Sequence, residues 1–151
     1  HMKAVIQRVS YARVSVDDNT IGQIGLGLLI LLGIEDGDNA TDAAWLAKKI
    51  TRMRIFSDGN GKMNLDLSTT GGELLVISQF TLHASTKKGA RPSYIKAARP
   101  EKAIPLYEEF ISECNDLTEN PVQSGEFGAD MKVELLNDGP VTIIIDSQNR
   151  E

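Results

Sequence analysis

"NDGPVTIII", residues 137–145, closes the series of strand patterns in this chain and determines how its last third folds. Asn-Asp-Gly-Pro is dense in turn formers, and the β-branched run that follows is typical of a buried strand. Proline has no backbone N–H and is confined to strand starts, edges and bulges. The pattern predicts two strands, residues 131–136 and 141–146, joined by a turn at Gly139-Pro140. The dipeptide raises a question: it either only turns the chain or also presents its backbone to a ligand.

Strand patterns also dominate the rest of the chain. Residues 2–16, "MKAVIQRVSYARVSV", alternate apolar and polar residues and predict a long strand with a bulge near Ser10. A turn at residues 17–19 leads to a short strand from Thr20. Buried strands are predicted at residues 26–32 and in "ELLVISQFTL", residues 73–82, and "SDGNGK", residues 57–62, is typical of a hairpin turn.

Two segments have helical periodicity. Turn and cap residues at 36–39 precede a predicted helix with one apolar face, made of Ala43, Leu46, Ala47, Ile50 and Met53. Pro100 suits the first turn of a second helix. The apolar stripe of that helix consists of Ala103, Leu106, Tyr107, Phe110, Ile111 and Cys114, and Pro105 predicts a kink or a late start. Strands outnumber helices and short turns favour antiparallel pairing. We therefore predict an α+β fold, a mostly antiparallel curled sheet or sandwich with two main helices, in a single domain over residues 1–151.

Composition limits the class of protein. With 151 residues, 41% apolar and 25% charged, the chain is typical of one soluble globular domain. The longest apolar stretch, residues 26–34, is too short to span a bilayer, and no signal peptide precedes it. The single cysteine rules out an internal disulfide, so we expect a cytoplasmic protein. His1-Met2 resembles the remnant of a cleaved tag.

Charge is distributed unevenly along the chain. The net charge is −5, which disfavours nucleic-acid binding by the chain as a whole. Residues 87–102, "KKGARPSYIKAARPEK", nevertheless contain six basic residues and one acid, so this basic strip carries +5 and the remainder −10. A basic strip on an acidic body can bind phosphates locally. The alternative is an ordinary solvated loop.

Familiar catalytic and cofactor motifs are missing. "GLGLLI", residues 25–30, lacks the third glycine of a dinucleotide loop, and no P-loop pattern occurs. Apart from His1, His83 is the only histidine, so His/Cys zinc spacing is absent. A Ser-His-Asp triad would have to use His83, but no Gly-x-Ser-x-Gly nucleophile elbow occurs. Cys114 lies in an apolar helical stripe and is interpreted as a core residue. We expect no metal and no cofactor.

"SQFTL", residues 78–82, is a polar interruption in an apolar strand. Strand alternation would place Ser78, Phe80 and Leu82 on one face and Gln79 and Thr81 on the other. These polar groups are either hydrogen-bonded core residues or part of a functional site.

Several fragments together resemble the D-aminoacyl-tRNA deacylase family. They are "IQRV" (6–9), "RIFSDGNGKMNLDL" (54–67), "SQFTL" (78–82), "KGARPSY" (88–94) and "FGADMKVELLNDGPVT" (127–142), in the order and spacing of the family and over nearly the whole chain. "SQFTL" and "NDGPVT" are its two signature motifs, and both are intact.

The resemblance implies hydrolysis of the ester between a D-amino acid and tRNA by a homodimer with sites at the subunit interface. It implies a cis Gly139-Pro140 peptide that enters the partner's pocket, where the two carbonyls accept hydrogen bonds from the substrate ammonium. An L side chain would then collide with backbone while a D side chain would not. Achiral glycine escapes this filter, so mischarged glycyl-tRNA is also an expected substrate.

The resemblance also assigns roles to other residues. The ester would lie near Ser78, Gln79, Phe80 and Thr81, where backbone N–H groups can stabilise an oxyanion. Thr81 matches a threonine proposed as nucleophile in the family, but no base motif accompanies it, so assistance by a ribose hydroxyl is favoured. Arg8 and Asn137 would support the gate, and the alternative interpretation of Arg8 is a charge on the surface of a strand.

The remaining predictions concern partners and rival functions. Lys87, Lys88 and Arg91 are candidates for tRNA phosphate contacts, and neither DNA nor a membrane is expected as a partner. Rival functions are a noncatalytic tRNA-binding module, a serine or threonine esterase using Ser78 or Thr81, and a sister deacylase with a trans Gly-Pro that clears an L-amino acid.

Overall fold

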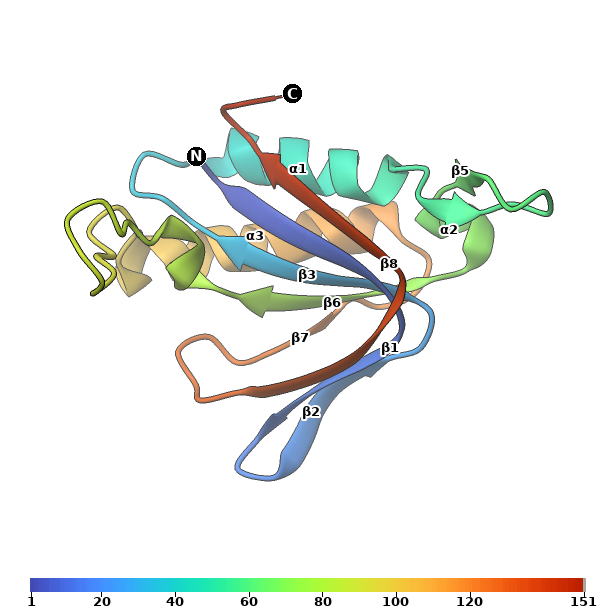
Figure 1. Cartoon of the computed structure of the whole chain (residues 1–151), viewed down its shortest axis with the longest axis horizontal. Helices are drawn as coiled ribbons and strands as arrows, with labels where there is room; N and C mark the ends of the chain where they lie inside the picture. Colours follow the sequence, from blue (N-terminus) through green and yellow to red (C-terminus); the bar gives the residue numbers. More distant parts are fainter. Residues whose placement is uncertain (151) are drawn as a thin grey trace.

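The computed structural model describes residues 1–150 and consists of one curled sheet with two long helices on one face (Figure 1). The sheet order is β2 (Asn19–Ile24), β1 (Lys3–Val16), β3 (Gly27–Gly33), β6 (Glu73–Ser78) and β7 (Gln123–Ser124), and β8 (Lys132–Asp146) pairs with β1. The helices are α1 (Ala40–Arg52) and α3 (Pro100–Leu117). A hairpin of β4 (Phe56–Ser57) and β5 (Met63–Leu65), the short helix α2 (Leu67–Thr70) and the 3-10 turn η1 (Phe80–His83) complete the chain. The α+β prediction, including the hairpin at residues 57–62, is confirmed.

Strand pairing is mostly antiparallel, as predicted, but two of the pairs are parallel. β1 runs antiparallel to β2, β3 and β8, but β3–β6 and β6–β7 are parallel pairs. Parallel neighbours need a crossover connection, and α1 and α3 occupy the two connections concerned. Both helices therefore pack on the same side of the sheet.

The bulge predicted near Ser10 is present and divides β1 between two cores. The β1–β8 register shifts between Val9 and Tyr11. Ala4 and Ile6 belong to the core under the helices, while Val9, Ala12 and Val14 belong to a second cluster inside the curl of the sheet. One extra residue reverses which side chains face a given side, so a single strand contributes to both cores.

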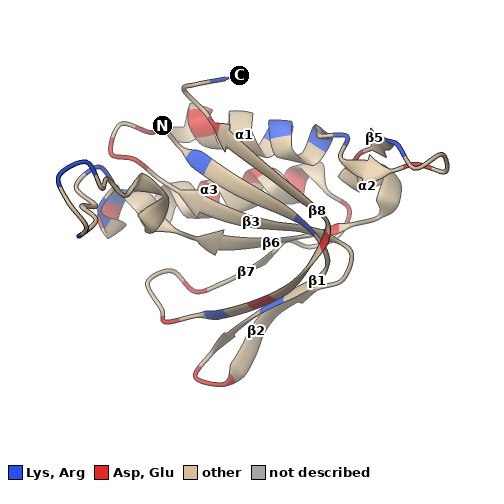
Figure 2. Ribbon diagram, in the orientation of Figure 1, with Lys and Arg blue, Asp and Glu red and all other residues tan. Residues whose placement is uncertain are grey.

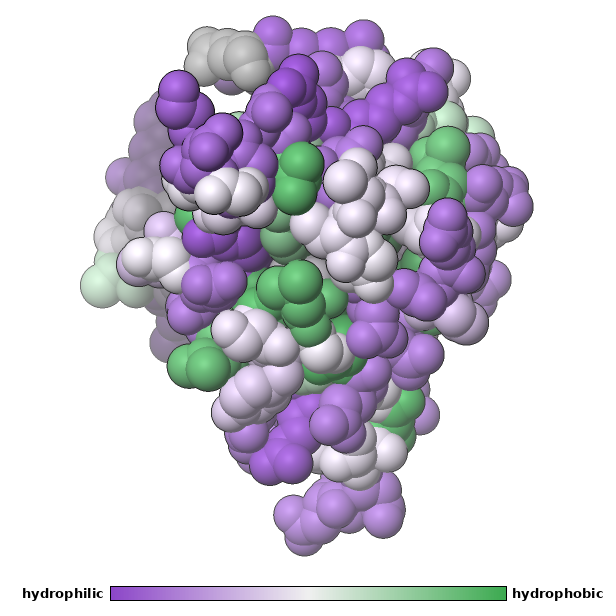
Figure 3. Space-filling view, turned by 90° about the vertical axis from the view of Figure 1, so that its right-hand side faces the viewer, coloured by the Kyte–Doolittle hydropathy of each residue, from purple (hydrophilic) through white to green (hydrophobic). Residues whose placement is uncertain are grey.

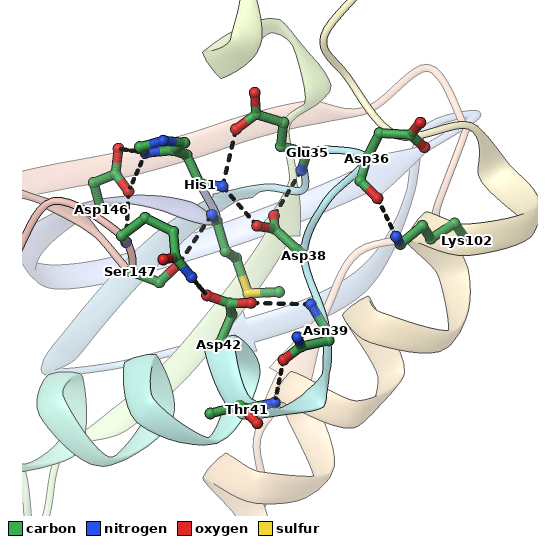
Figure 4. A network of polar contacts seen from close by, with 12 residues as sticks. His1, Glu35, Asp36, Asp38, Asn39, Thr41, Asp42, Lys102, Asp146 and Ser147 are labelled. Carbon is green, nitrogen blue, oxygen red and sulfur yellow. Dashed lines mark hydrogen bonds and ion pairs between the residues drawn. The ribbon is translucent and has the colours of Figure 1, made fainter.

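The start of α1 is fixed by a polar network that also holds both ends of the chain (Figure 4). The Asn39 side chain accepts from the Thr41 N–H at 2.9 Å, and the Asp42 carboxylate accepts from the Asn39 N–H at 2.9 Å. Ser147 donates to Asp42 at 2.7 Å and accepts from the Met2 N–H at 3.1 Å. Burial alone would raise the pKa of Asp42, but these hydrogen bonds outweigh it and the pKa is lowered. Met2 and Ser147, near the two ends of the described residues, are thereby attached to the first turn of α1.

Helix α3 begins at Pro100 and continues through Pro105, so the expected late start is wrong. Pro105 is exposed, and its ring faces away from the core. Cys114 is fully buried and burial raises its pKa to about 12, consistent with a core residue rather than a nucleophile. No helix among residues 1–150 is long and apolar enough to cross a membrane.

Residues 131–146 do not form the predicted pair of strands with a turn between them. Residues 132–146 form one strand, β8, whose two halves both pair with β1. Nor is the second half buried on both faces: Val141, Ile143 and Ile145 pack on the core, but Ile144 is 72% exposed. β8 is therefore a half-buried strand at the edge of the sheet, a place where proline is tolerated.

Candidate active site

The Gly139-Pro140 dipeptide lies in a bulge that projects from β8. Gln7 faces Thr142 and Val9 faces Asn137, so the four residues between them, 138–141, face Arg8 alone. Gly139 and Pro140 are exposed, and their peptide bond is cis, as the family resemblance implied. The segment that looked like a turn is thus a strand bulge that presents backbone to the outside.

The Arg8 side chain holds this bulge by hydrogen bonds to backbone carbonyls. Its side chain is only 9% exposed, its Nε–H donates to the Asp138 carbonyl at 3.0 Å, and Nη1 donates to the Ile55 carbonyl at 2.7 Å. The alternative reading of Arg8 as a surface charge is wrong. Asn137 adds backbone pairing with Val9, but its side chain makes no hydrogen bond within residues 1–150. The side-chain support for the bulge therefore comes from Arg8, which holds the Asp138 carbonyl.

Glycine is required at position 139. Its φ is +124°, a conformation that L side chains rarely adopt. A Cβ there would lie 2.9 Å from Arg8 Nη2 and 2.9 Å from Val141 Cγ2. The close approach of the bracing guanidinium thus depends on the missing side chain.

"SQFTL" is not a strand throughout, which corrects the predicted alternation of its side chains. Pairing with β3 ends at Ser78 opposite Leu32, and η1 begins at Phe80. The Gln79 N–H donates to the Leu32 carbonyl at 2.7 Å, and the Gln79 side-chain amide donates to Thr81 Oγ1 at 2.5 Å. The first bond of the turn runs from the Leu82 N–H to the Gln79 carbonyl, so the N–H groups of Phe80 and Thr81 precede any acceptor inside the turn.

Gly33 packs directly against this turn and His83 is its buried last residue, and neither was predicted from the sequence to be part of the site. A Cβ on Gly33 would lie 3.0 Å from the Gln79 carbonyl oxygen and 3.0 Å from Leu82 Cβ. The turn therefore packs directly against the backbone of Gly33, with no room for a side chain. His83 is buried, and within residues 1–150 its Nε2 has no hydrogen-bond partner. Burial lowers its pKa, and a hydrogen bond with the Gly33 backbone offsets part of that shift. The only sequence signal was a glycine at the end of an apolar run.

A pocket of about 280 Å³ opens beside the turn. It lies where β6 ends, between the start of α3 and the loop at residues 127–131, and Phe80 is one of its lining residues. Its lining is mostly apolar and includes Ile77, Ala103, Phe127 and Met131. The carboxyl end of a parallel strand is a frequent place for a ligand site in α/β sheets, and the pocket has the small apolar character of such sites.

The bulge and the turn are far apart within one chain. Arg8, below the bulge, pairs with Leu28 near the start of β3, whereas Ser78 pairs with Leu32 near its end. Figure 1 shows the bend of β8 and the end of β6 at opposite sides of the molecule. The two signature motifs therefore do not meet within one copy of the chain.

The basic strip forms an exposed loop at the same end as the turn. Figure 2 shows its Lys and Arg residues clustered there. Lys87, Lys88 and Arg91 are exposed and form no ion pair within residues 1–150. Lys102 instead donates to the Asp36 carbonyl. The charges of Lys87, Lys88 and Arg91 are thus not paired with a carboxylate in the part of the chain that the structure describes.

Comparison with known proteins decides the family. The profile of the family described as D-Tyr-tRNA(Tyr) deacylase matches residues 5–146. The chain belongs to this family. A protein named D-aminoacyl-tRNA deacylase from Parabacteroides distasonis is 61% identical over 150 residues, covering 99% of this chain and all of the relative, and one of the same name from Akkermansia muciniphila is equally similar. The prediction of a deacylase, a hydrolase of the aminoacyl-tRNA ester, is confirmed.

Two solved structures share the deacylase fold. One described as c-Myc DNA Unwinding Element Binding Protein has a TM-score of 0.90 and 36% identity, covering 95% of this chain and 97% of its own. A probable eukaryotic D-amino acid tRNA deacylase has a TM-score of 0.82 at 14% identity, covering 95% and 98%, and that likeness shows the fold alone.

Proposed function

We propose that this deacylase hydrolyses the ester of D-aminoacyl-tRNA in a site shared by two copies of the chain. The observation that supports it most directly is the exposed Gly139-Pro140 backbone, braced by buried Arg8 yet remote from the "SQFTL" turn of its own chain. A second copy brings the bulge of one chain to the turn of the other. Each dimer then has two complete sites.

Exposed apolar side chains near the bulge support a homodimer. Leu26 is 44% and Leu136 is 52% exposed, and both adjoin positions paired with Val9. Figure 3, which views this side of the molecule, shows apolar residues gathered across the middle of the face. Contiguous exposed apolar surface is typical of protein contacts. Light scattering and dilution assays test this, and an active stable monomer would contradict a shared site.

Selection by chirality follows from the gate. The carbonyls of Gly139 and Pro140 accept hydrogen bonds from the substrate ammonium, and the ester is held at the turn. With both groups fixed, only one of the two remaining directions at the Cα is open, and a D side chain takes it. Glycine has no side chain to collide, so glycyl-tRNA mischarged on a non-cognate tRNA is also hydrolysed.

The hydrolysis itself relies on backbone and substrate rather than a side-chain nucleophile. The N–H groups of Phe80 and Thr81, which have no acceptor inside the turn, stabilise the oxyanion. Thr81 Oγ1 receives a hydrogen bond from the Gln79 amide, which cannot act as a base, and no other side chain among residues 1–150 is hydrogen-bonded to it. The vicinal hydroxyl of the terminal ribose therefore assists attack by water.

Single-turnover rates test this assignment. Thr81→Ala on D-aminoacyl-tRNA retains substantial deacylation, whereas wild type hydrolyses a 3′-charged tRNA ending in 2′-deoxyadenosine poorly. Loss of a true nucleophile lowers kcat by several orders of magnitude. An inactive Thr81→Ala together with normal cleavage of the deoxy substrate makes Thr81 the nucleophile. Matched L-aminoacyl-tRNA measures the chirality filter and separates this function from that of a deacylase for L-amino acids.

The basic strip is proposed to contact tRNA phosphates. Replacing Lys87, Lys88 and Arg91 with Ala weakens tRNA binding and flattens the dependence of log K on log salt, because fewer counterions are released. An unchanged salt slope would leave the strip a solvated loop.

A further inference from the structure

Phe80 and Tyr94 form an exposed aromatic pair at the edge of the proposed site. Their ring centroids are 5.1 Å apart with an interplanar angle of 76°, an edge-to-face arrangement. The residues remain 56% and 39% exposed, and the adjacent Ile95 is 87% exposed. Neither ring belongs to either core cluster. The pair thus leaves aromatic surface open to solvent beside the turn that holds the ester.

The base of the loop holds Tyr94 in this position. Ser85 and Ser93 exchange two backbone hydrogen bonds, each of 2.8 Å, which close the segment between them. On the other side the Tyr94 carbonyl accepts from the Ala97 N–H at 3.0 Å. Tyr94 is therefore flanked by paired backbone, while Lys87, Lys88 and Arg91 lie on the loop that the Ser85–Ser93 pairing closes.

Exposed rings next to unpaired cations are the combination that binds single-stranded nucleic acid. Bases stack on the rings, and the cations follow the phosphates. The aminoacyl ester sits on the last nucleotide of an unpaired 3′ end. With the ester at the Phe80–Thr81 turn, the preceding nucleotide must leave the site past neighbouring surface, and the aromatic pair borders that turn.

We propose that Tyr94, supported edge-on by Phe80, is a stacking platform for the base that precedes the terminal adenosine of the tRNA. This inference rests on the proposed function, because the ester must lie at the turn. It assigns Tyr94 to recognition of the RNA strand rather than to the chemistry, and it makes binding at this point insensitive to which base is present.

The test compares Tyr94→Leu, which keeps apolar bulk without a π face, with Tyr94→Phe, which keeps the ring. The substrates are D-aminoacyl-tRNA and D-aminoacyl-adenosine, which lacks the preceding nucleotide. Tyr94→Leu lowers kcat/KM on the tRNA by about 5- to 150-fold, the range measured for loss of one stacked base. It leaves kcat/KM on aminoacyl-adenosine within about twofold, and Tyr94→Phe behaves as wild type on both.

Two results would overturn the platform: an equal loss on both substrates, which would make Tyr94 a support of the turn, and no loss on either. A changed sedimentation coefficient of Tyr94→Leu would also overturn it, because the surface would then contact a second copy. Binding of an uncharged RNA ending in CCA, measured by anisotropy, keeps this test separate from the proposed function. If wild type binds it and Tyr94→Leu does not, stacking stands even where no D-ester is hydrolysed.

Discussion

Replacing Gly139 with alanine tests the bulge at its most constrained point. The new methyl meets Arg8 Nη2 and Val141 Cγ2 at 2.9 Å, and φ of +124° is unfavourable for any L side chain. Arg8 cannot withdraw freely, because its Nε and Nη1 are hydrogen-bonded to Asp138 and Ile55. The backbone conformation alone costs about 1–3 kcal/mol. For a chain of this length each kcal/mol lowers Tm by about 2–4 °C.

The effect on activity is expected to exceed the effect on stability. Relief of the contact moves the Gly139 and Pro140 carbonyls, and a displacement of about 1 Å can reduce catalysis about 100-fold. The assay is single-turnover deacylation of D-aminoacyl-tRNA alongside thermal unfolding. We expect a fall in kcat/KM of that order and a Tm lowered by several degrees.

The chain offers two matched controls for Gly139→Ala. Gly61 has a φ of +76° with no atom within 4 Å of an added Cβ, so Gly61→Ala measures backbone strain without a steric contact. Gly37→Ala has open space and no positive φ, so it measures neither. Both should retain wild-type kcat/KM. A folded Gly139→Ala with wild-type kcat/KM for the D-substrate would refute the role of the bulge in the site.

Three further predictions concern the groups that position the bulge and the turn. Arg8→Met leaves the Ile55 and Asp138 carbonyls without their charged donor, which lowers the free energy of unfolding by about 3 kcal/mol or more. Chemical denaturation measures this free energy, and a loss below about 1 kcal/mol would contradict the role of Arg8 in holding the bulge. Gly33→Ala adds a Cβ 3.0 Å from the Gln79 carbonyl oxygen and from Leu82 Cβ, and so displaces the turn. The value of kcat should therefore fall more than KM rises, and a change in KM alone would argue against a role of the turn in the chemistry. Burial lowers the pKa of His83 below its ordinary 6.5, so the neutral ring stabilises the fold above that pH and the contribution is lost as pH falls through the folded pKa. Urea unfolding between pH 7.5 and 5 should therefore show a smaller loss for His83→Leu than for wild type, and equal slopes would exclude His83 as the cause.

Features set by local periodicity were predictable from the sequence. The apolar face of α1 is buried at Ala43, Leu46, Ala47 and Ile50, as the spacing required. The bulge in β1 was visible because the apolar alternation breaks near Ser10. In each case a single segment is enough for the prediction, because the residues on one face of a helix or strand are only a few positions apart in the sequence.

Features set by distant partners were not predictable. The β6 strand stops at Ser78 because its neighbour β3 ends at Gly33, and nothing within "SQFTL" encodes that limit. Arg8 is buried because the Ile55 carbonyl, 47 residues away, accepts from it. Turn formers at 137–140 suit a strand bulge as well as a hairpin, and only the pairing of both halves of β8 with β1 separates the two.

In the proposed mechanism the groups that touch the substrate are backbone atoms: the N–H groups of Phe80 and Thr81 and the carbonyls of Gly139 and Pro140. The side chains around them only fix where that backbone lies, Arg8 under the bulge and Gln79 at the turn. Backbone atoms are present whatever side chain a position carries, so a substitution relaxes selectivity only by moving the chain. Positions that cannot change without moving it, such as Gly33 and Gly139, are therefore where chirality selection is most easily lost.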